Sequence, residues 1–186
     1  MKSADGIEGL PDSPAEVAVV GRSNVGKSSL INALGHNSKL ALTSKTPGRT
    51  RLLNVFALPN GSTLVDCPGY GYASAPAHLR QAWQKMAERY LLEREPLTMI
   101  MVLVDGEIGP TKLDVQMLDW VRHHGRPHTV IATKHDKVKA SVRDKRKRDL
   151  AAGSGVATNE VVWVSAAKGT GMDRIRGLVT GWLAPD

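Results

Sequence analysis

The sequence has a single cysteine, Cys67, among its 186 residues. One cysteine cannot form a disulfide within the chain, which excludes a disulfide-stapled fold and fits a reducing compartment. Residues 1–12 contain no apolar stretch of signal-peptide length. No run approaches the roughly 18 apolar residues of a membrane span, and the longest candidate, residues 97–104, is the size of a strand. We therefore expect a soluble, cytoplasmic protein that does not contact a membrane.

Internal repeats, low-complexity tracts and dividing linkers are also missing, and the six histidines show no metal-ligand spacing with cysteine or carboxylates. A hydrophobic content of 41% and a charged content of 23% are ordinary for a globular protein of this length. Residues 1–14 are rich in Gly, Pro, Ser and Asp and predict a flexible arm. We expect residues 15–186 to form a single domain, and the protein to be a monomer.

Positive charge exceeds negative charge. The 25 lysines and arginines stand against 18 acidic residues, which gives a formal net charge of +7 and a pI of about 9.7. This balance favours a polyanionic partner, with nucleic acid as the first candidate. A predicted helix carries the basic residues Arg143, Lys145, Arg146, Lys147 and Arg148. They predict either an ordinary solvated helix face or an RNA contact, and both interpretations stay open.

One stretch, residues 21–28, matches the phosphate-binding pattern G-x-x-x-x-G-K-[S/T]. A glycine turn lets successive backbone N–H groups surround a phosphate, and the helix that follows adds the positive end of its dipole. The lysine supplies a charge for the β- and γ-phosphates, and the serine hydroxyl is a Mg²⁺ ligand. An apolar strand at residues 17–20 and a helix ended by Gly35 flank the loop, as this motif requires. Its residues are Gly21, Arg22, Ser23, Asn24, Val25, Gly26, Lys27 and Ser28.

Strand-like and helix-like segments alternate along the rest of the chain. Apolar runs predict strands at residues 51–58, 62–65, 98–104, 129–132 and 161–164, and the first two form a hairpin around Asn60-Gly61. Helical spacing predicts helices over residues 79–95, 113–125, 138–152 and 175–182. The order predicts an α/β, doubly wound, mostly parallel sheet of six strands, with helices on both faces and one antiparallel edge strand.

Asp66-Cys67-Pro68-Gly69 follows the second hairpin strand. A carboxylate at a strand end can hold Mg²⁺ through water, and a glycine lets a backbone N–H approach the γ-phosphate. Alone, the motif fits a simple turn equally well. Behind a phosphate-binding loop it favours a nucleoside triphosphate site.

A second motif, Thr133-Lys134-His135-Asp136, follows the strand at residues 129–132. A carboxylate here can accept hydrogen bonds from guanine N1–H and the exocyclic amine, whereas adenine presents no such donor pair. The lysine stem can lie along the base plane. Small residues after the last strand, Ser165 and Ala166, let a backbone N–H reach guanine O6. The pair of motifs predicts a site for a guanine nucleotide.

These motifs, in this order, resemble the translation-factor branch of small GTPases. The strings at residues 22–32, 45–50, 66–73 and 133–137 are similar to the EngB (YihA/YsxC) family, and the resemblance covers residues 16–183. It departs at Arg51, where the family usually has Gln, and at residues 54–56, where the family has an aromatic pair. These departures leave the shape of the first switch loop open.

The resemblance implies a GTPase that uses Mg²⁺ and acts in assembly of the large ribosomal subunit, with an effect on cell division and septation. The implied partners are GTP, GDP and the large subunit or its precursor. Implied roles in hydrolysis fall on Lys27, Thr50 and Gly69, and implied Mg²⁺ ligands are Ser28, Thr50 and Asp66. The implied nucleotide contacts are Gly21, Arg22, Ser23, Asn24, Val25, Gly26, Lys27, Ser28, Ser29, Gly48, Arg49, Thr50, Asp66, Cys67, Pro68, Gly69, Thr133, Lys134, His135, Asp136, Val164, Ser165 and Ala166.

Two residues carry alternatives. Tyr70 stands where Ras-like enzymes have the water-orienting glutamine, which predicts slow intrinsic hydrolysis unless another residue orients the water. Asn24 either binds K⁺ near the phosphates, as in related GTPases with this asparagine, or makes a loop hydrogen bond. Two rival functions also stand: a P-loop metabolic kinase, which the base-reading motif disfavours, and a GTPase that acts directly on the division machinery.

Overall fold

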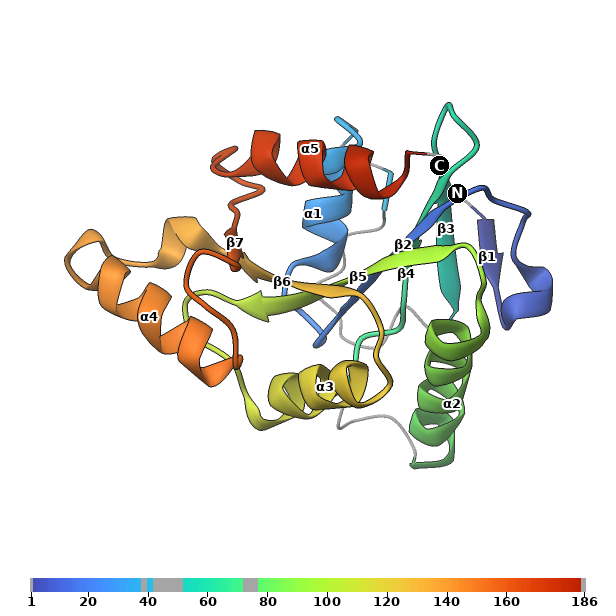
Figure 1. Ribbon diagram of the computed structural model, residues 1–186, viewed down its shortest axis with the longest axis horizontal. Coiled ribbons are helices and arrows are strands. Elements are labelled where there is room, and N and C mark those ends of the chain that lie inside the picture. Colours follow the sequence, from blue (N-terminus) through green and yellow to red (C-terminus); the bar gives the residue numbers. More distant parts are fainter. Residues whose placement is uncertain (1, 38–39, 42–51, 72–76, 185–186) are drawn as a thin grey trace.

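The computed structural model describes residues 2–37, 40–41, 52–71 and 77–184. Its centre is a seven-stranded sheet with the strand order β1-β3-β4-β2-β5-β6-β7 (Figure 1). Strands β4, β2, β5, β6 and β7 are parallel, and β3 runs antiparallel to both of its neighbours. The predicted α/β, mostly parallel fold is confirmed. The strands are β1 (Lys2–Ala4), β2 (Glu16–Gly21), β3 (Leu53–Ala57), β4 (Thr63–Asp66), β5 (Leu97–Asp105), β6 (His128–Thr133) and β7 (Val162–Trp163).

The strand count of six is wrong, because residues 2–4 of the predicted arm form β1 and pair with β3. The edge strand on this side of the sheet is therefore β1, and β3 lies between β1 and β4. A 3-10 turn at Ile7–Gly9 follows β1, and Ala4 and Leu10 bury their side chains in the core. Three residues have no readable period of their own, and their partner lies about fifty residues away. Local sequence pattern could not identify this strand.

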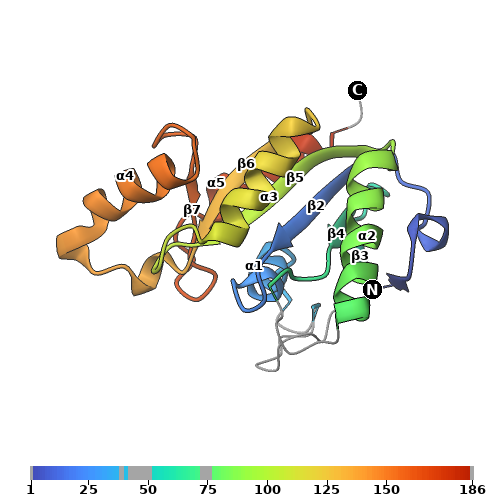
Figure 2. The ribbon, with the colours of Figure 1, turned by 90° about the horizontal axis from the view of Figure 1, so that it is seen from below.

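Helices cover both faces of the sheet. Helices α1 (Lys27–Leu34) and α5 (Met172–Trp182) lie on one side, and α2 (Ala77–Glu93) and α3 (Lys112–His123) on the other (Figures 1 and 2). Strand β2 divides the core between them, since alternate side chains point to opposite faces. Val17 and Val19 join the cluster under α1 and α5, whereas Ala18 and Val20 join the cluster under α2 and α3.

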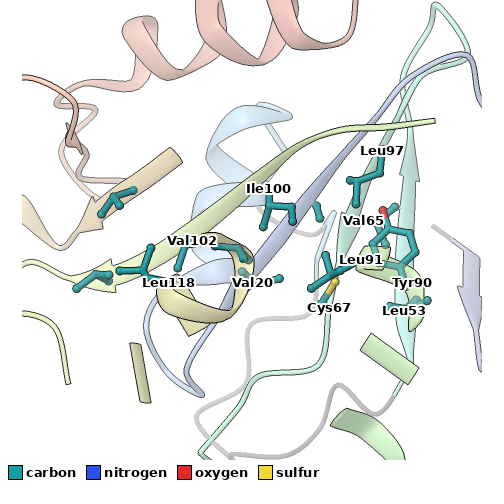
Figure 3. Packing of buried hydrophobic residues seen from close by; sticks show 14 of the residues in the cluster. Val20, Leu53, Val65, Cys67, Tyr90, Leu91, Leu97, Ile100, Val102 and Leu118 are labelled. Carbon is teal, nitrogen blue, oxygen red and sulfur yellow. The ribbon is translucent and has the colours of Figure 1, made fainter. Parts of the chain in front are cut away.

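The second cluster is the one drawn in Figure 3. Tyr90 and Leu91 of α2 reach Val65 and Cys67 at one end, and Leu118 of α3 packs beside Val102 at the other. These side chains are at most 1% exposed. Burying side chains of this size contributes about 1.5–3 kcal/mol each, so this layer fixes the sheet on which the loops are mounted.

Helix α4 spans Arg143–Gly153, so the predicted start at residue 138 is wrong. The chain first makes two 3-10 turns, at His135–Lys137 and Ala140–Val142. Val138 between them is extended, with φ −77° and ψ 114°. Its side chain is 5% exposed. Anchoring of this valine interrupts the helix that the charged sequence alone would favour.

Because β2, β4, β5 and β6 are parallel, their carboxyl ends meet at one edge of the sheet. That edge carries Gly21, Asp66, Asp105 and Thr133. Within the described ranges, no helix is long and apolar enough to cross a membrane.

Candidate functional site

The loop between β2 and α1 has the backbone of a phosphate cradle. Gly26 has φ 109°, a conformation that favours glycine, and it caps the N-terminus of α1. Asn24 also lies in the left-handed region, with φ 64°. A Cβ on Gly21 would lie 2.8 Å from Val25 Cγ1 and 3.1 Å from the Leu103 carbonyl oxygen, so both glycines of the motif are sterically required. The loop therefore leads directly into the N-terminus of α1, where the first backbone N–H groups have no partner within the helix.

Lys27 and Asp66 face each other across this cradle. Their Nζ and Oδ1 atoms are 3.9 Å apart, and both side chains are at least 90% buried. Burial raises the pKa of Asp66 to about 6, against the lowering effects of Lys27 and of a hydrogen bond with Asn54. Among the described residues, Asp66 Oδ1 has no hydrogen-bond partner. A buried carboxylate oxygen without a donor, at the same edge of the sheet as the half-buried Ser28, fits a hydrated Mg²⁺.

The segment after Asp66 lies directly on the cradle. The Ser23 N–H donates to the Tyr70 carbonyl at 3.1 Å, and the Tyr70 N–H donates to the Gly21 carbonyl at 3.3 Å. A Cβ on Gly69 would lie 3.1 Å from Lys27 Nζ and from both Ser23 N and Oγ. A side chain at this position would force these neighbours to move by a few tenths of an ångström. The two motifs that the sequence assigned to the phosphates are thus in contact.

A buried carboxylate on α3 joins these loops. Asp114 Oδ1 accepts the Tyr70 hydroxyl at 2.9 Å, and Oδ2 accepts Arg22 Nε at 3.2 Å. Oδ2 also accepts the Thr111 N–H and hydroxyl, both at 2.8 Å, in the capping box of α3. Burial and the charge of Asp114 raise the pKa of the Tyr70 hydroxyl, which keeps it a donor. The Tyr70 ring thus anchors its loop to α3.

Thr133, at the end of β6, ties this strand to the phosphate loop. Its hydroxyl lies 2.7 Å from the Val25 carbonyl and 3.2 Å from the Val104 carbonyl. The next residue, Lys134, has φ 55°, and its Nζ lies 2.6 Å from Asp105 Oδ2. The hydroxyl thus links the end of β6 to the phosphate loop.

Asp136 and Ser165 meet at the far side of the site. The Ser165 hydroxyl donates to Asp136 Oδ1 at 2.6 Å and accepts the Lys168 N–H at 3.1 Å. The Ser165 hydrogen bond lowers the pKa of Asp136 against a small effect of burial, so the carboxyl is ionised at neutral pH. An exposed, ionised and oriented carboxylate can accept a pair of donors from a base edge.

This chain is similar to known GTP-binding proteins. A family model described as a 50S ribosome-binding GTPase matches residues 16–134. The probable GTP-binding protein EngB of Aromatoleum aromaticum is 43% identical over 178 residues, which cover 93% of this chain and 81% of that protein. This chain belongs to the EngB family. It is a P-loop GTPase.

Solved structures agree on the fold. A crystal structure of a probable GTP-binding protein EngB has a TM-score of 0.74 at 22% identity, covering 91% of this chain and 98% of that one. Era in complex with MgGDPNP and nucleotides 1506–1542 of 16S ribosomal RNA has a TM-score of 0.73 at 25% identity, covering 92% and 57%. NFeoB from S. thermophilus, bound to GDP.AlF4⁻ and K⁺, has a TM-score of 0.61 at 25% identity, covering 89% and 61%.

The predicted site residues of this EngB-family chain differ in what the structure shows of them. The phosphate loop and Asp66–Gly69 are brought together, and Asp136 meets Ser165. The His135 N–H donates to the Val164 carbonyl at 3.1 Å, which holds the loop after β6 to the segment that follows β7. Asn24 and Ser29 are exposed, and Ala166 is half-buried. Gly48, Arg49 and Thr50 lie outside the described residues.

Two carboxylates of the site were missed from the sequence. Asp105 follows an apolar strand just as Asp66 does, so its position was a usable signal. Asp114 has no such sequence signal, because a carboxylate on an amphipathic helix is expected to lie at the surface. Its complete burial follows only from the partners that the fold supplies.

Proposed function

We propose that this GTPase is a Mg²⁺-dependent, cytoplasmic switch that acts in assembly of the large ribosomal subunit. One observation carries the nucleotide part: Lys27, Asp66 and Gly69 gather at the phosphate loop, and Asp136 is oriented by Ser165 at the same edge of the sheet. A metabolic kinase has no use for the second feature.

Guanine recognition falls to Asp136. Its carboxylate accepts the N1–H and the exocyclic amine, while the Ser165 hydroxyl fixes its orientation. The Ala166 N–H donates to the base carbonyl O6. An adenine base leaves the carboxylate without donors, which costs on the order of several kcal/mol. A titration of labelled GDP against unlabelled ATP tests this, and equal competition by the two nucleotides would contradict it.

Phosphate binding falls to the cradle. Its backbone N–H groups and Lys27 hold the β- and γ-phosphates, and Ser28, Thr50 and Asp66 hold Mg²⁺, Asp66 through a water molecule. The metal, when bound, neutralises charge on the phosphate oxygens. Gly69 presents its backbone N–H to the γ-phosphate, so the segment that now lies on Ser23 and Lys27 changes contacts with the nucleotide state.

Intrinsic hydrolysis is slow. The Tyr70 hydroxyl is committed to Asp114 and does not orient a water molecule. We expect single-turnover rates near the unassisted Ras scale of about 10⁻⁴ to 10⁻³ per second. Asn24 holds K⁺ beside the phosphates, a proposal supported by the K⁺ in the related NFeoB structure. Exchange of Na⁺ for K⁺ therefore raises the rate. Fast turnover that is indifferent to the monovalent ion would refute both statements.

The ribosomal partner rests on the matched family model, a 50S ribosome-binding GTPase, and on the net charge of +7. A tenfold preference for one nucleotide state needs about 1.4 kcal/mol of differential contact. Co-sedimentation with purified large-subunit particles under a GTP analogue, GDP and no nucleotide tests it. We expect the GTP-analogue form to bind tightest. Equal binding in all three states would refute the proposal that the protein is a nucleotide-dependent switch. No binding in any state would refute the proposal that the large subunit is its partner.

A further inference from the structure

Almost all of the net charge of the molecule lies in one segment of twelve residues. Residues 137–148 contain seven lysines and arginines and one aspartate, a formal charge of +6 in a protein whose net charge is +7. The remaining 174 residues are close to neutral. We call residues 137–148 the basic segment. It comprises the end of the 3-10 turn at His135–Lys137, the 3-10 turn at Ala140–Val142 and the first half of α4. Its cations are Lys137, Lys139, Arg143, Lys145, Arg146, Lys147 and Arg148.

These charges are not neutralised by the protein. None of the ion pairs formed within the described residues includes a cation of the basic segment. Arg143 and Arg146 donate to backbone carbonyls, of Val138 and Ile108, which leaves their charge in place. The effect extends to His135, whose pKa is lowered first by burial and then by Arg143 and Lys147.

The placement of these charges opposes helix stability. The first turn of α4 holds three cations, Arg143, Lys145 and Arg146, against one acidic residue, Asp144, next to the positive end of the helix dipole, where cations are unfavourable. Helix α3 has a more favourable arrangement, with Lys112 and Asp114 in its first turn and Arg122 in its last. Like charges three residues apart, as at Lys145 and Arg148, also repel. A bound anion would offset the repulsion among these cations, which gives a reason for a segment that otherwise lowers the stability of the fold.

We propose that the basic segment binds the phosphate backbone of RNA. This deepens the proposed function, since it assigns a contact surface for a ribosomal partner. Protein interfaces favour apolar anchors and are depleted of lysine, whereas this segment offers long cationic side chains around an exposed helix. Binding to phosphates gains free energy from released counterions, which this surface suits. Helix α4 lies at the opposite end of the molecule from α2 and β1 in both views (Figures 1 and 2), where it can lie along an RNA strand.

The test uses the full-length protein and a labelled single-stranded RNA of mixed sequence, with fluorescence anisotropy across a salt series. The main variant is Lys145→Gln with Arg148→Gln, because both side chains are exposed and form no ion pair with described residues. A second variant reverses both charges to Glu. The matched control is Lys2→Gln with Lys85→Gln, two exposed cations at the other end of the molecule.

We expect each lost phosphate contact to reduce the slope of log K against log salt by about 0.7, and affinity at about 0.1 M salt by about fivefold. The Gln variant should then bind RNA about 25-fold more weakly than wild type and the Glu variant more weakly still, whereas the control should keep the wild-type affinity. The melting temperature of the Gln variant rises slightly and its GTP hydrolysis is unchanged, which separates lost binding from lost folding.

Equal affinity and slope for wild type and both variants would overturn the proposal. Binding of polyglutamate in preference to RNA would also overturn it, in favour of an acidic protein partner. The same variants are then sedimented with large-subunit particles. If wild type and variants bind the particles equally, the RNA contact fails and the proposed function stands. If the wild-type protein does not bind the particles, the proposed function fails. The RNA titration then decides by itself whether the basic segment binds RNA.

Discussion

The contact between Tyr70 and Asp114 makes a sharp prediction, because Tyr70 stands where related enzymes orient the attacking water. Its hydroxyl lies 2.9 Å from a carboxylate that is completely buried. We expect Tyr70→Phe to leave the single-turnover rate of GTP hydrolysis within about threefold of wild type, since a group that acts on the reacting atoms would cost about 100-fold or more. The variant loses only an anchor.

The magnitude of that anchor follows from the structure. A hydrogen bond to an ionised group contributes about 1.5–3 kcal/mol, and the half-buried ring favours the lower part of that range. Tyr70→Phe should therefore lower the free energy of unfolding by about 1.5–2 kcal/mol. Asp114→Ala should lower it by about 3–5 kcal/mol, since it also strands Arg22 and removes the capping box of α3.

Urea unfolding of the nucleotide-free protein measures both changes, and the double variant completes the cycle. Because the two groups touch, their effects should fall short of additivity by about 1 kcal/mol or more. Single-turnover hydrolysis is measured on the same proteins. A 100-fold loss of rate in Tyr70→Phe, with stability unchanged, would refute the anchor and make the hydroxyl a catalytic group. Additive stabilities would show that the contact does not form in solution.

Three further outcomes are expected. Asp136→Asn should lower GDP affinity by several kcal/mol and favour xanthine nucleotides, whose C2 carbonyl can accept from an amide; unchanged competition in a labelled-GDP titration would contradict this. Arg94→Met should lower the free energy of unfolding by about 3–5 kcal/mol, because the Glu16 carboxylate is 0% exposed and accepts two hydrogen bonds from that arginine; a change below 1 kcal/mol in urea unfolding would be incompatible. Burial raises the pKa of the Cys67 thiol and leaves it 1% exposed, so a thiol reagent should label it only as fast as the protein unfolds, and labelling at the rate of a free cysteine would disprove that.

The parts of this protein that could be predicted are those with local signals. The phosphate loop needs glycines at fixed positions, and the buried strands are apolar runs, so β2, α1 and β5 were found close to their observed bounds. The hairpin of β3 and β4 was found because Asn-Gly selects its turn, and Gly61 has φ 83°. In contrast, β1 depends on backbone pairing with a distant strand, and the start of α4 depends on the burial of Val138.

The same limit separates the carboxylates of the site. Asp66 and Asp136 were assigned because each stands in a motif whose other residues indicate the ligand. Asp105 also ends an apolar strand, but its partner Lys134 directly follows the neighbouring parallel strand β6, and its Nζ lies 2.6 Å from Asp105 Oδ2. Sequence could place Asp105 at this edge without assigning it a partner. The fold brings Lys134 to it, and the resulting ion pair holds the lysine of the base-reading motif before any nucleotide arrives. We expect this ion pair, formed in advance, to lower the conformational entropy that base binding has to overcome.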